Sequence, residues 1–173
     1  MQSKSELVIP YLGLANGLHN YIYIVDQHFW KGFETSKISE GQMEVDIIFD
    51  KLDGLVTLSI ECNGAYKAKC DRCVAEIMIP MQFEDTIIIK IQEASGEETE
   101  VTFMDPKTSH IDLAPLIYES IHVHMPIISL KNCEEDDYKG CDQEILDRLY
   151  GSDEEKNKSP SGIWKELDNL NLN

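Results

Sequence analysis

Basic side chains are scarce in this sequence of 173 residues. The chain has 15 lysines and arginines against 32 aspartates and glutamates, so its formal net charge is −17. This balance excludes a protein that binds nucleic acid over its whole surface, because such surfaces are basic. Any contact with RNA must therefore come from a local basic patch.

The sequence also lacks long apolar runs, a signal peptide and an even set of cysteines. Its longest apolar runs, such as Ile87–Ile89, fall far short of the roughly 20 residues that a membrane-spanning helix needs. The first six residues contain no basic stretch followed by an apolar one. Five cysteines without an export signal favour reduced thiols or thiolate ligands over disulfides. We therefore expect a cytoplasmic protein.

The composition changes along the chain. Residues 134–173 hold 12 acidic and 5 basic side chains, and they are rich in Asp, Glu, Lys, Asn and Ser. Residues 1–133 are richer in β-branched and aromatic side chains. The sequence therefore predicts a domain over 1–133 and an acidic helical tail over 134–173, with a flexible linker at 151–159.

The first part of the chain alternates apolar and polar residues with a period of two, which is typical of half-buried strands. The alternation runs through 43–50 and 56–62, and Asp53-Gly54 between them is a hairpin signal. A third run over 76–91 predicts one long or bent strand, and a further strand is expected at 21–25. In this pattern Cys62 lies in phase with Leu58 and Ile60, so we expect it to be buried as a small hydrophobe.

Helical patterns follow the strands. The principal helix is predicted to begin at Asp112 as N-cap and to end before Pro126, and a single turn capped by Asp26 is expected earlier. Shorter helices are predicted at 143–150 and 161–170. The fold class predicted is α+β: a mostly antiparallel β-sheet or partly closed barrel, with one principal packed helix and a helical C-terminal tail.

Four cysteines are the candidate metal ligands: Cys70, Cys73, Cys133 and Cys141. Cys70 and Cys73 form a Cys-x-x-Cys at a strand-to-strand turn, where two thiolates can face one tetrahedral Zn²⁺, and the later pair supplies the other two ligands. A redox dithiol is the second interpretation, although its Cys-x-x-Cys usually begins a helix. The third is that the thiols only cap a tight turn and fill the edge of a core. The spacing leaves all three open.

Around the same turn three basic residues, Lys67, Lys69 and Arg72, reverse the acidic trend of the chain. They are the candidate contacts for RNA phosphate or for an acidic segment of a partner, and the simpler alternative is that they offset neighbouring acids. The sequence has no glycine-rich phosphate loop, no His-Glu-x-x-His and no Gly-x-Ser-x-Gly. We therefore predict no enzymatic activity and no catalytic residues.

The order of these motifs resembles the YceD family of large ribosomal RNA subunit accumulation proteins. The resemblance rests on Lys69–Val74 around the two cysteines, on Ile111–Ile121, on Met125-Pro126, and on a later cysteine-bearing segment. It implies a factor in large ribosomal subunit biogenesis that supports accumulation of the large-subunit ribosomal RNA. The expected partner is that RNA or a large-subunit ribosomal protein, and the acidic composition is better suited to a basic protein. The alternative is a zinc-binding or redox-responsive protein-interaction module.

Overall fold

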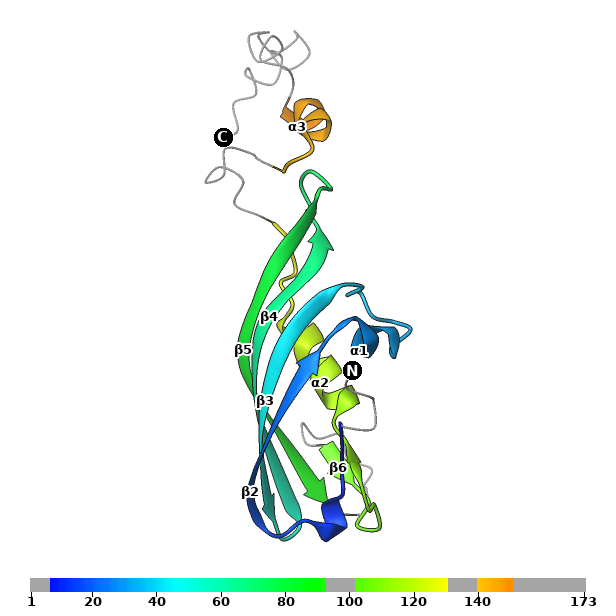
Figure 1. The fold of residues 1–173 in the computed structure, drawn as a ribbon, viewed down its shortest axis with the longest axis vertical. Helices are drawn as coiled ribbons and strands as arrows, with labels where there is room; N and C mark the ends of the chain where they lie inside the picture. The colour runs from blue at the N-terminus through cyan, green and yellow to red at the C-terminus, as the bar shows by residue number, and fades with distance from the viewer. Residues whose placement is uncertain (1–6, 93–101, 131–139, 151–173) are drawn as a thin grey trace, which may run out of the picture. The chain divides into compact units, whose positions relative to one another are not determined.

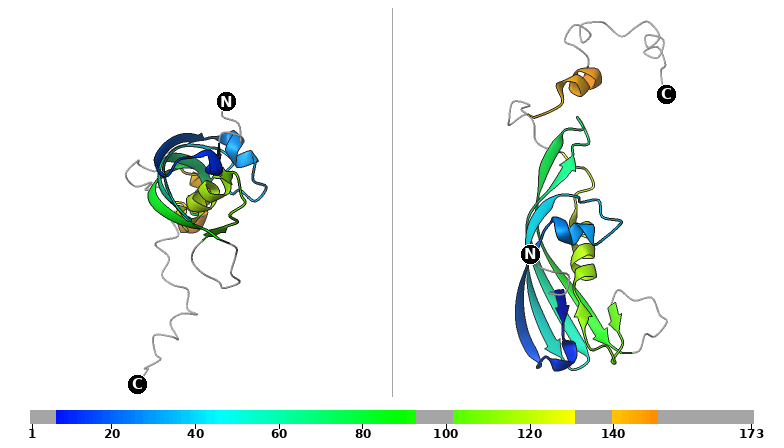
Figure 2. Two further views of the ribbon diagram at one scale, coloured as in Figure 1. Left: turned by 90° about the horizontal axis from the view of Figure 1, so that it is seen from below. Right: turned by 45° about the vertical axis from the view of Figure 1, so that its right-hand side comes forward.

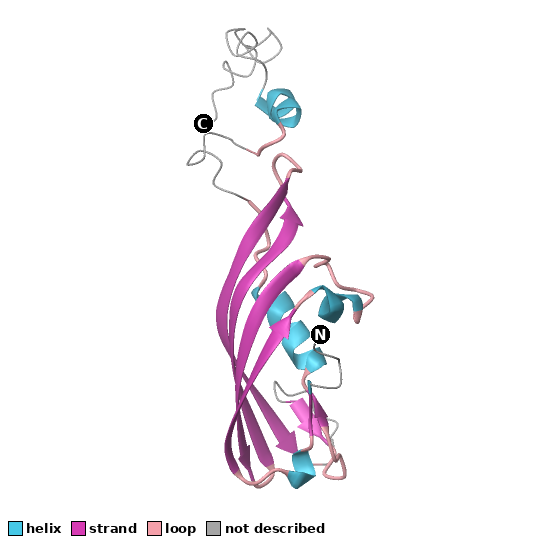
Figure 3. Cartoon of the chain, in the orientation of Figure 1, coloured by secondary structure: helices cyan, strands magenta, loops and turns pink. Residues whose placement is uncertain are grey.

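A computed structural model describes residues 7–92, 102–130 and 140–150 of the chain. The chain separates into two compact units, one formed by 1–68 with 78–128 and the other by 69–77 with 129–173. Figures 1 and 3 show the elements of each unit. The predicted division of the chain at residues 133 and 134 stays a prediction.

The described elements follow the order that the sequence pattern suggests, with several short additions. The strands are β1 (Val8–Ile9), β2 (Gly17–Val25), β3 (Gly41–Leu52), β4 (Leu55–Lys69), β5 (Glu76–Ile91), β6 (Thr102–Met104) and β7 (Ile111–Asp112). The helices are α1 (Gln27–Lys31), α2 (Ala114–His124) and α3 (Gln143–Tyr150), with a 3-10 turn η2 at Tyr11–Gly13.

Five strands form one sheet in the order β2-β3-β4-β5-β6. The predicted hairpin is confirmed: β3 and β4 pair antiparallel from Leu52 opposite Leu55, and Gly54 takes a φ of +75° in the two-residue turn. The single long strand predicted over 76–91 is confirmed as β5. The α+β class is therefore confirmed.

The sheet is mixed and open. β6 pairs parallel with β5, whereas β2 and β3 pair antiparallel. The described strands end at β2 on one edge and β6 on the other, so they form an open sheet and no closed barrel. β1 and β7 form a separate two-stranded sheet. The pattern in the sequence missed β1, β6 and β7, each of which has only two or three residues.

Helix α2 lies against the concave face of the sheet, as Figures 1 and 2 show. It buries Ala114, Ile117, Ser120 and Ile121. It begins two residues after the predicted cap Asp112, whose carboxylate still accepts a hydrogen bond from the backbone N–H of Ala114 at 2.9 Å. The Ser120 hydroxyl donates to the carboxylate of Asp85 on β5, which fixes the helix against the sheet.

Much of the core is formed by the buried side chains of β3, β4 and β5. Alternate residues of these strands are at most 9% exposed, and they are Met43, Val45, Ile47, Phe49, Val56, Leu58, Ile60, Cys62, Ile77, Ile79, Met81 and Phe83. Cys62 is fully buried, and burial raises the pKa of its thiol to about 11. The expectation that Cys62 serves as a small core hydrophobe is confirmed.

One lysine also points into this core. Lys51 is 9% exposed, and its Nζ donates hydrogen bonds to the backbone oxygens of Tyr11 at 2.7 Å and Leu14 at 2.6 Å. The same Nζ lies 4.2 Å from the centre of the Tyr11 ring. Lys51 therefore ties the segment around η2 to β3, forty residues later in the chain.

Two further predicted helices are present. α1 is capped by Asp26, whose carboxylate accepts from the N–H of His28 at 2.8 Å and of Phe29 at 3.4 Å. α3 coincides with the helix expected at 143–150. The expected linker at 151–159 and helix at 161–170 lie outside the described residues. No helix in the described ranges is long and apolar enough to span a membrane.

Candidate functional site

The cysteine turn, defined as residues 70–75, joins β4 to β5. Two backbone hydrogen bonds close it: Cys70 N–H donates to the oxygen of Ala75, and Val74 N–H donates to the oxygen of Cys70, each at 2.9 Å. The turn therefore holds Cys70 and Cys73 three residues apart on one tight loop, as their spacing predicts.

Val74 adopts a left-handed conformation in this turn, with a φ of 61°, and its side chain is 51% exposed. A β-branched residue in this region costs about 1–3 kcal/mol relative to an extended one. Because the exposed side chain gains little packing energy, the closing hydrogen bonds of the turn must hold this conformation.

Three thiols meet at Cys73. Cys70 and Cys73 are each 1% exposed, Cys141 is half-buried, and none of the three is in a disulfide. Burial raises the pKa of the Cys73 thiol, but backbone hydrogen bonds from Asp142 and Ala75 and side-chain hydrogen bonds with Cys70 and Cys141 outweigh it. The pKa of Cys73 therefore lies below its ordinary value. The hydrogen bonds stabilise the ionised form of Cys73 relative to an ordinary thiol.

Helix α3 contributes to this environment through its first residues. Asp142 caps α3, since its carboxylate accepts from the N–H of Ile145 at 3.3 Å and its backbone oxygen accepts from Leu146 at 3.1 Å. The Asp142 backbone also bonds to Cys73. The N-cap residue of α3 therefore contacts the Cys73 thiol directly.

Asp71 holds the segment after α2 against the cysteine turn. Its backbone N–H donates to the oxygen of Ser129 at 2.9 Å, and its carboxylate accepts from the N–H of Ser129 at 2.6 Å. Ser129 precedes Cys133 by four residues in the sequence, and Cys133 itself lies outside the described residues. The sequence offers no signal for this pair, because the two residues are 58 positions apart.

Thiolates at the cysteine turn suit a soft ion such as Zn²⁺ in tetrahedral coordination. The structure brings together Cys70, Cys73 and Cys141 from the predicted set of four. Among the described residues, however, no group of three or more His, Cys, Asp and Glu side chains has the arrangement of a metal site. The three-thiol cluster is thus a candidate part of a site, and the four-cysteine set stays a prediction.

The three basic residues near this turn have different surroundings. Lys67 on β4 forms an ion pair with Glu40 at 3.5 Å, and both side chains are partly exposed. Lys69 at the end of β4 is exposed, and Arg72 in the turn is half-buried. A cation that already faces a carboxylate contributes less to phosphate binding, so the patch is weaker than its sequence indicates. Its role in RNA or partner binding stays a prediction.

Two histidines at the end of α2 are held in place by contacts within the fold. The Nδ1 atoms of His122 and His124 bond to the backbone oxygens of Tyr118 and Ser120, at 2.8 and 2.9 Å. The ring of His124 stacks on Phe83 with centroids 4.2 Å apart. Both side chains therefore pack as parts of the helix end.

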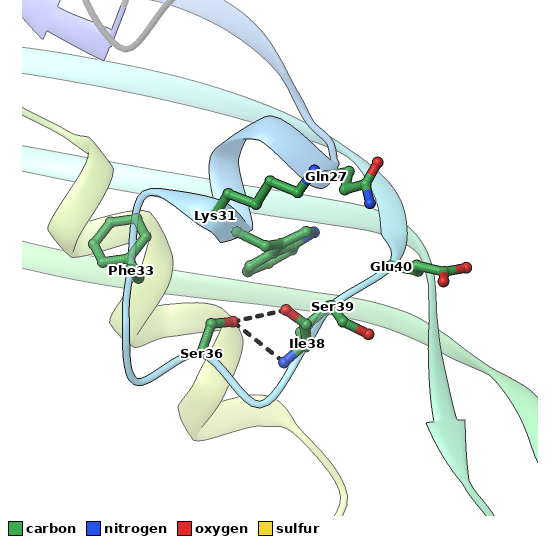
Figure 4. Close-up of a pocket in the computed structure, with 8 residues that line it drawn as sticks. Gln27, Lys31, Phe33, Ser36, Ile38, Ser39 and Glu40 are labelled. Atoms are coloured by element: carbon green, nitrogen blue, oxygen red, sulfur yellow. Dashed lines mark hydrogen bonds between the residues drawn. The ribbon is translucent and has the colours of Figure 1, made fainter.

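A shallow cavity of about 230 Å³ lies beside Trp30 (Figure 4). Its lining includes Lys31, Phe33 and Glu40, and the Ser36 hydroxyl is engaged with the backbone of Ile38 at 2.9 Å. Small-molecule sites usually exceed about 300 Å³ and present several convergent polar groups. This cavity is smaller than such sites, so we do not assign a ligand to it.

Comparison with known proteins adds one match. A family model described as "Large ribosomal RNA subunit accumulation protein YceD" matches residues 58–171, which is about two thirds of the chain. The match spans the cysteine turn, α2 and α3. No curated protein and no solved structure matches the chain.

Proposed function

The chain belongs to the YceD family, and from this membership we propose that it supports accumulation of large-subunit ribosomal RNA as a non-enzymatic binding factor. The observation that carries the proposal is the family match over residues 58–171. The description of that family names an accumulation protein, which supports a role in assembling or protecting ribosomal material.

The direct partner that we propose is a basic ribosomal protein of the large subunit. The net charge of −17 attracts a basic polypeptide and repels RNA phosphate at long range. Lys67 faces Glu40, and the predicted patch must give up that ion pair before Lys67 can contact a phosphate. Such exposed pairs are worth about 0–1 kcal/mol, so direct RNA contact through Lys67, Lys69 and Arg72 is the alternative that the experiment must test.

The test is co-purification of the tagged protein from lysate, with and without ribonuclease, followed by identification of the retained large-subunit components. A protein partner predicts that specific large-subunit proteins stay bound after digestion. Loss of all ribosomal material on digestion would instead indicate RNA as the direct partner. Absence of large-subunit material in both arms would contradict the proposed function.

The second candidate function is a structural zinc site at the cysteine turn, formed by Cys70, Cys73, Cys133 and Cys141. It is favoured by one observation, the hydrogen bonds of the Cys73 thiol with both Cys70 and Cys141. Bound Zn²⁺ would hold the turn and the segment before α3 together and would stabilise their fold. The redox interpretation uses the same thiols, with a disulfide in place of the metal.

Elemental analysis of protein prepared without chelator separates these interpretations. The zinc site predicts about one zinc per chain in the wild type and none in Cys73→Ser. Cys62→Ala is the matched control, because it removes a buried cysteine of the core and leaves the zinc content unchanged. Metal-free wild-type protein with the same thermal stability as Cys73→Ser would contradict the zinc site. A disulfide that forms under mild oxidant in that metal-free protein would favour the redox interpretation.

A further inference from the structure

The outer face of the sheet, defined as the side of β2, β3 and β4 opposite to the buried core, combines acidic and apolar side chains. The strand register places them in rows across the three strands. One row is Ile22, Asp46 and Glu61; the next toward the β3–β4 turn is Asn20, Ile48 and Ser59; and the third is Leu18, Asp50 and Thr57. Acidic and apolar groups therefore alternate along β3 itself.

The row that contains Ile22 places two negative charges side by side. Asp46 on β3 is the register partner of Glu61 on β4, and like charges directly opposite each other destabilise a sheet. None of Asp46, Asp50 and Glu61 forms an ion pair within the described part of the chain. The fold therefore retains a repulsive pair that no described cation offsets.

The apolar members of this face are large and open to solvent. Leu18 is 70% exposed, Ile22 is 61% exposed and Ile48 is 47% exposed. Figures 1 and 2 show α2 on the opposite face, and no described element of this unit covers the outer one. Ile48 is a diagonal neighbour of both Leu18 and Ile22 in the register, within reach of their side chains. Such a group of apolar side chains on an uncovered face favours the binding of another molecule.

We propose that the outer face docks a basic polypeptide segment that also carries apolar side chains. This rests on the proposed function, and it names the surface and the chemistry by which a ribosomal protein is held. Lysine or arginine side chains of the segment pair with Asp46, Asp50 and Glu61, while its apolar side chains cover Leu18, Ile22 and Ile48. Binding relieves the repulsion between Asp46 and Glu61, so the gain is larger than for isolated carboxylates.

The spacing on β3 fits an extended segment. Same-face neighbours along a strand are about 6.8 Å apart, so Asp46, Ile48 and Asp50 present an acid-apolar-acid repeat over about 14 Å. An extended chain with alternating basic and apolar residues on one side repeats at the same interval. RNA phosphates are anionic, and the charged side chains in these three rows, Asp46, Asp50 and Glu61, are all carboxylates that repel them.

The direct test uses two fluorescent decapeptides, one with Lys at positions 1, 5 and 9, Leu at positions 3 and 7 and Ser at every even position, and one with Ser replacing each Leu. The affinity of each peptide is measured for the wild-type chain and for the triple variant Asp46→Asn/Ile48→Thr/Glu61→Gln. Loss of two charge contacts and one apolar contact predicts about tenfold weaker binding of the Leu peptide. The Ser peptide is expected to bind the wild type more weakly than the Leu peptide does.

The matched control is Glu34→Gln/Glu119→Gln, which removes the same charge from exposed positions outside the outer face. It should change affinity for the Leu peptide less than about twofold, because long-range attraction alone is screened by salt. Equal weakening in both variants, or none in the triple variant, would overturn the proposal. Tighter binding of an oligouridylate than of the Leu peptide would overturn it as well.

A second variant keeps the proposal testable if the triple variant fails to fold. Leu18→Ser/Ile22→Thr changes only β2, and it should also weaken the Leu peptide while leaving the Ser peptide unaffected. The co-purification experiment then separates the two proposals. If the triple variant and the wild type retain the same large-subunit proteins, the docking surface is wrong and the proposed function stands. If the wild type retains none, the proposed function fails whatever the peptides show.

Discussion

The two faces of β3 carry opposite chemistry on alternate residues of one strand. On the inner face Met43, Val45, Ile47 and Phe49 are at most 1% exposed and pack into the core. On the outer face Asp46 opposes Glu61, and Ile48 is left open to solvent. The inner face therefore stabilises the fold, whereas the repulsion between Asp46 and Glu61 on the outer face opposes it. We infer that the outer face is retained for binding, because it does not serve stability.

The largest expected effect comes from the inner face. Phe49→Ala removes a fully buried ring that meets Tyr21 edge-on at 6.4 Å between centroids. It should lower the free energy of unfolding by about 3–5 kcal/mol in denaturant titration. The neighbour Ile48→Thr, on the outer face, should change it by less than about 0.5 kcal/mol. Similar losses for both substitutions would remove the distinction between the faces.

The next effect concerns Lys51, a buried cation of the inner face. Lys51→Met keeps the unbranched apolar stem, one atom shorter than lysine, but removes the donor to the backbone oxygens of Tyr11 and Leu14. Leaving these acceptors without a partner should cost about 1–3 kcal/mol and speed amide exchange in residues 7–16. Lys90→Met, at an exposed position of β5, is the control. Unchanged exchange in residues 7–16 would show that Lys51 does not hold this segment.

A smaller effect depends on pH. Burial raises the pKa of Cys62 from 9.0 to about 11, so the folded state favours the neutral thiol. Its contribution to stability is full below pH 9 and is lost as the pH rises from 9 to 11, because the unfolded chain then releases the proton more easily. The stability difference between wild type and Cys62→Ala should shift by about 1–2 kcal/mol across that range. A difference that stays constant with pH would contradict the burial of this thiol.

The smallest expected effect is a stabilisation, opposite in sign to the effects above. Asp46→Asn removes the repulsion with Glu61 and should raise the free energy of unfolding by about 0.2–1 kcal/mol, most clearly at low salt. Asp50→Asn is the control, because Asp50 faces Thr57 and has no acidic register partner. Stabilisation by Asp50→Asn as large as that by Asp46→Asn would show a general charge effect and not a local pair.

Much of the fold could be predicted because its long elements follow one period each. The alternation in 43–50 and 56–62 and the Asp53-Gly54 turn correspond to the β3–β4 hairpin, and the apolar spacing after Asp112 corresponds to α2. β1, β6 and β7 could not be predicted, since two or three residues carry no period and depend on pairing with distant strands. The parallel pairing of β6 and the openness of the sheet are likewise long-range properties.

The candidate site was less predictable than the fold. The Cys-x-x-Cys turn follows from spacing, whereas the role of Asp142 as the N-cap of α3 was not predicted and comes from the structure. The contacts of Asp71 with Ser129 and of Cys73 with Cys141 join residues more than fifty positions apart, which no local pattern reports. The alternation of buried and exposed residues along β3 also places Lys51 on the inner face. Its hydrogen-bond acceptors, however, come from an irregular segment about forty residues earlier in the chain.

The central claim is that the outer face supports accumulation of large-subunit ribosomal RNA by holding a basic ribosomal protein. The most direct measurement is the ratio of large- to small-subunit ribosomal RNA in cells whose own copy is depleted and replaced by a variant. The account predicts that the wild type and Glu34→Gln/Glu119→Gln restore the ratio, and that Asp46→Asn/Ile48→Thr/Glu61→Gln, at equal protein level, leaves it low. Full restoration by the triple variant would contradict the account.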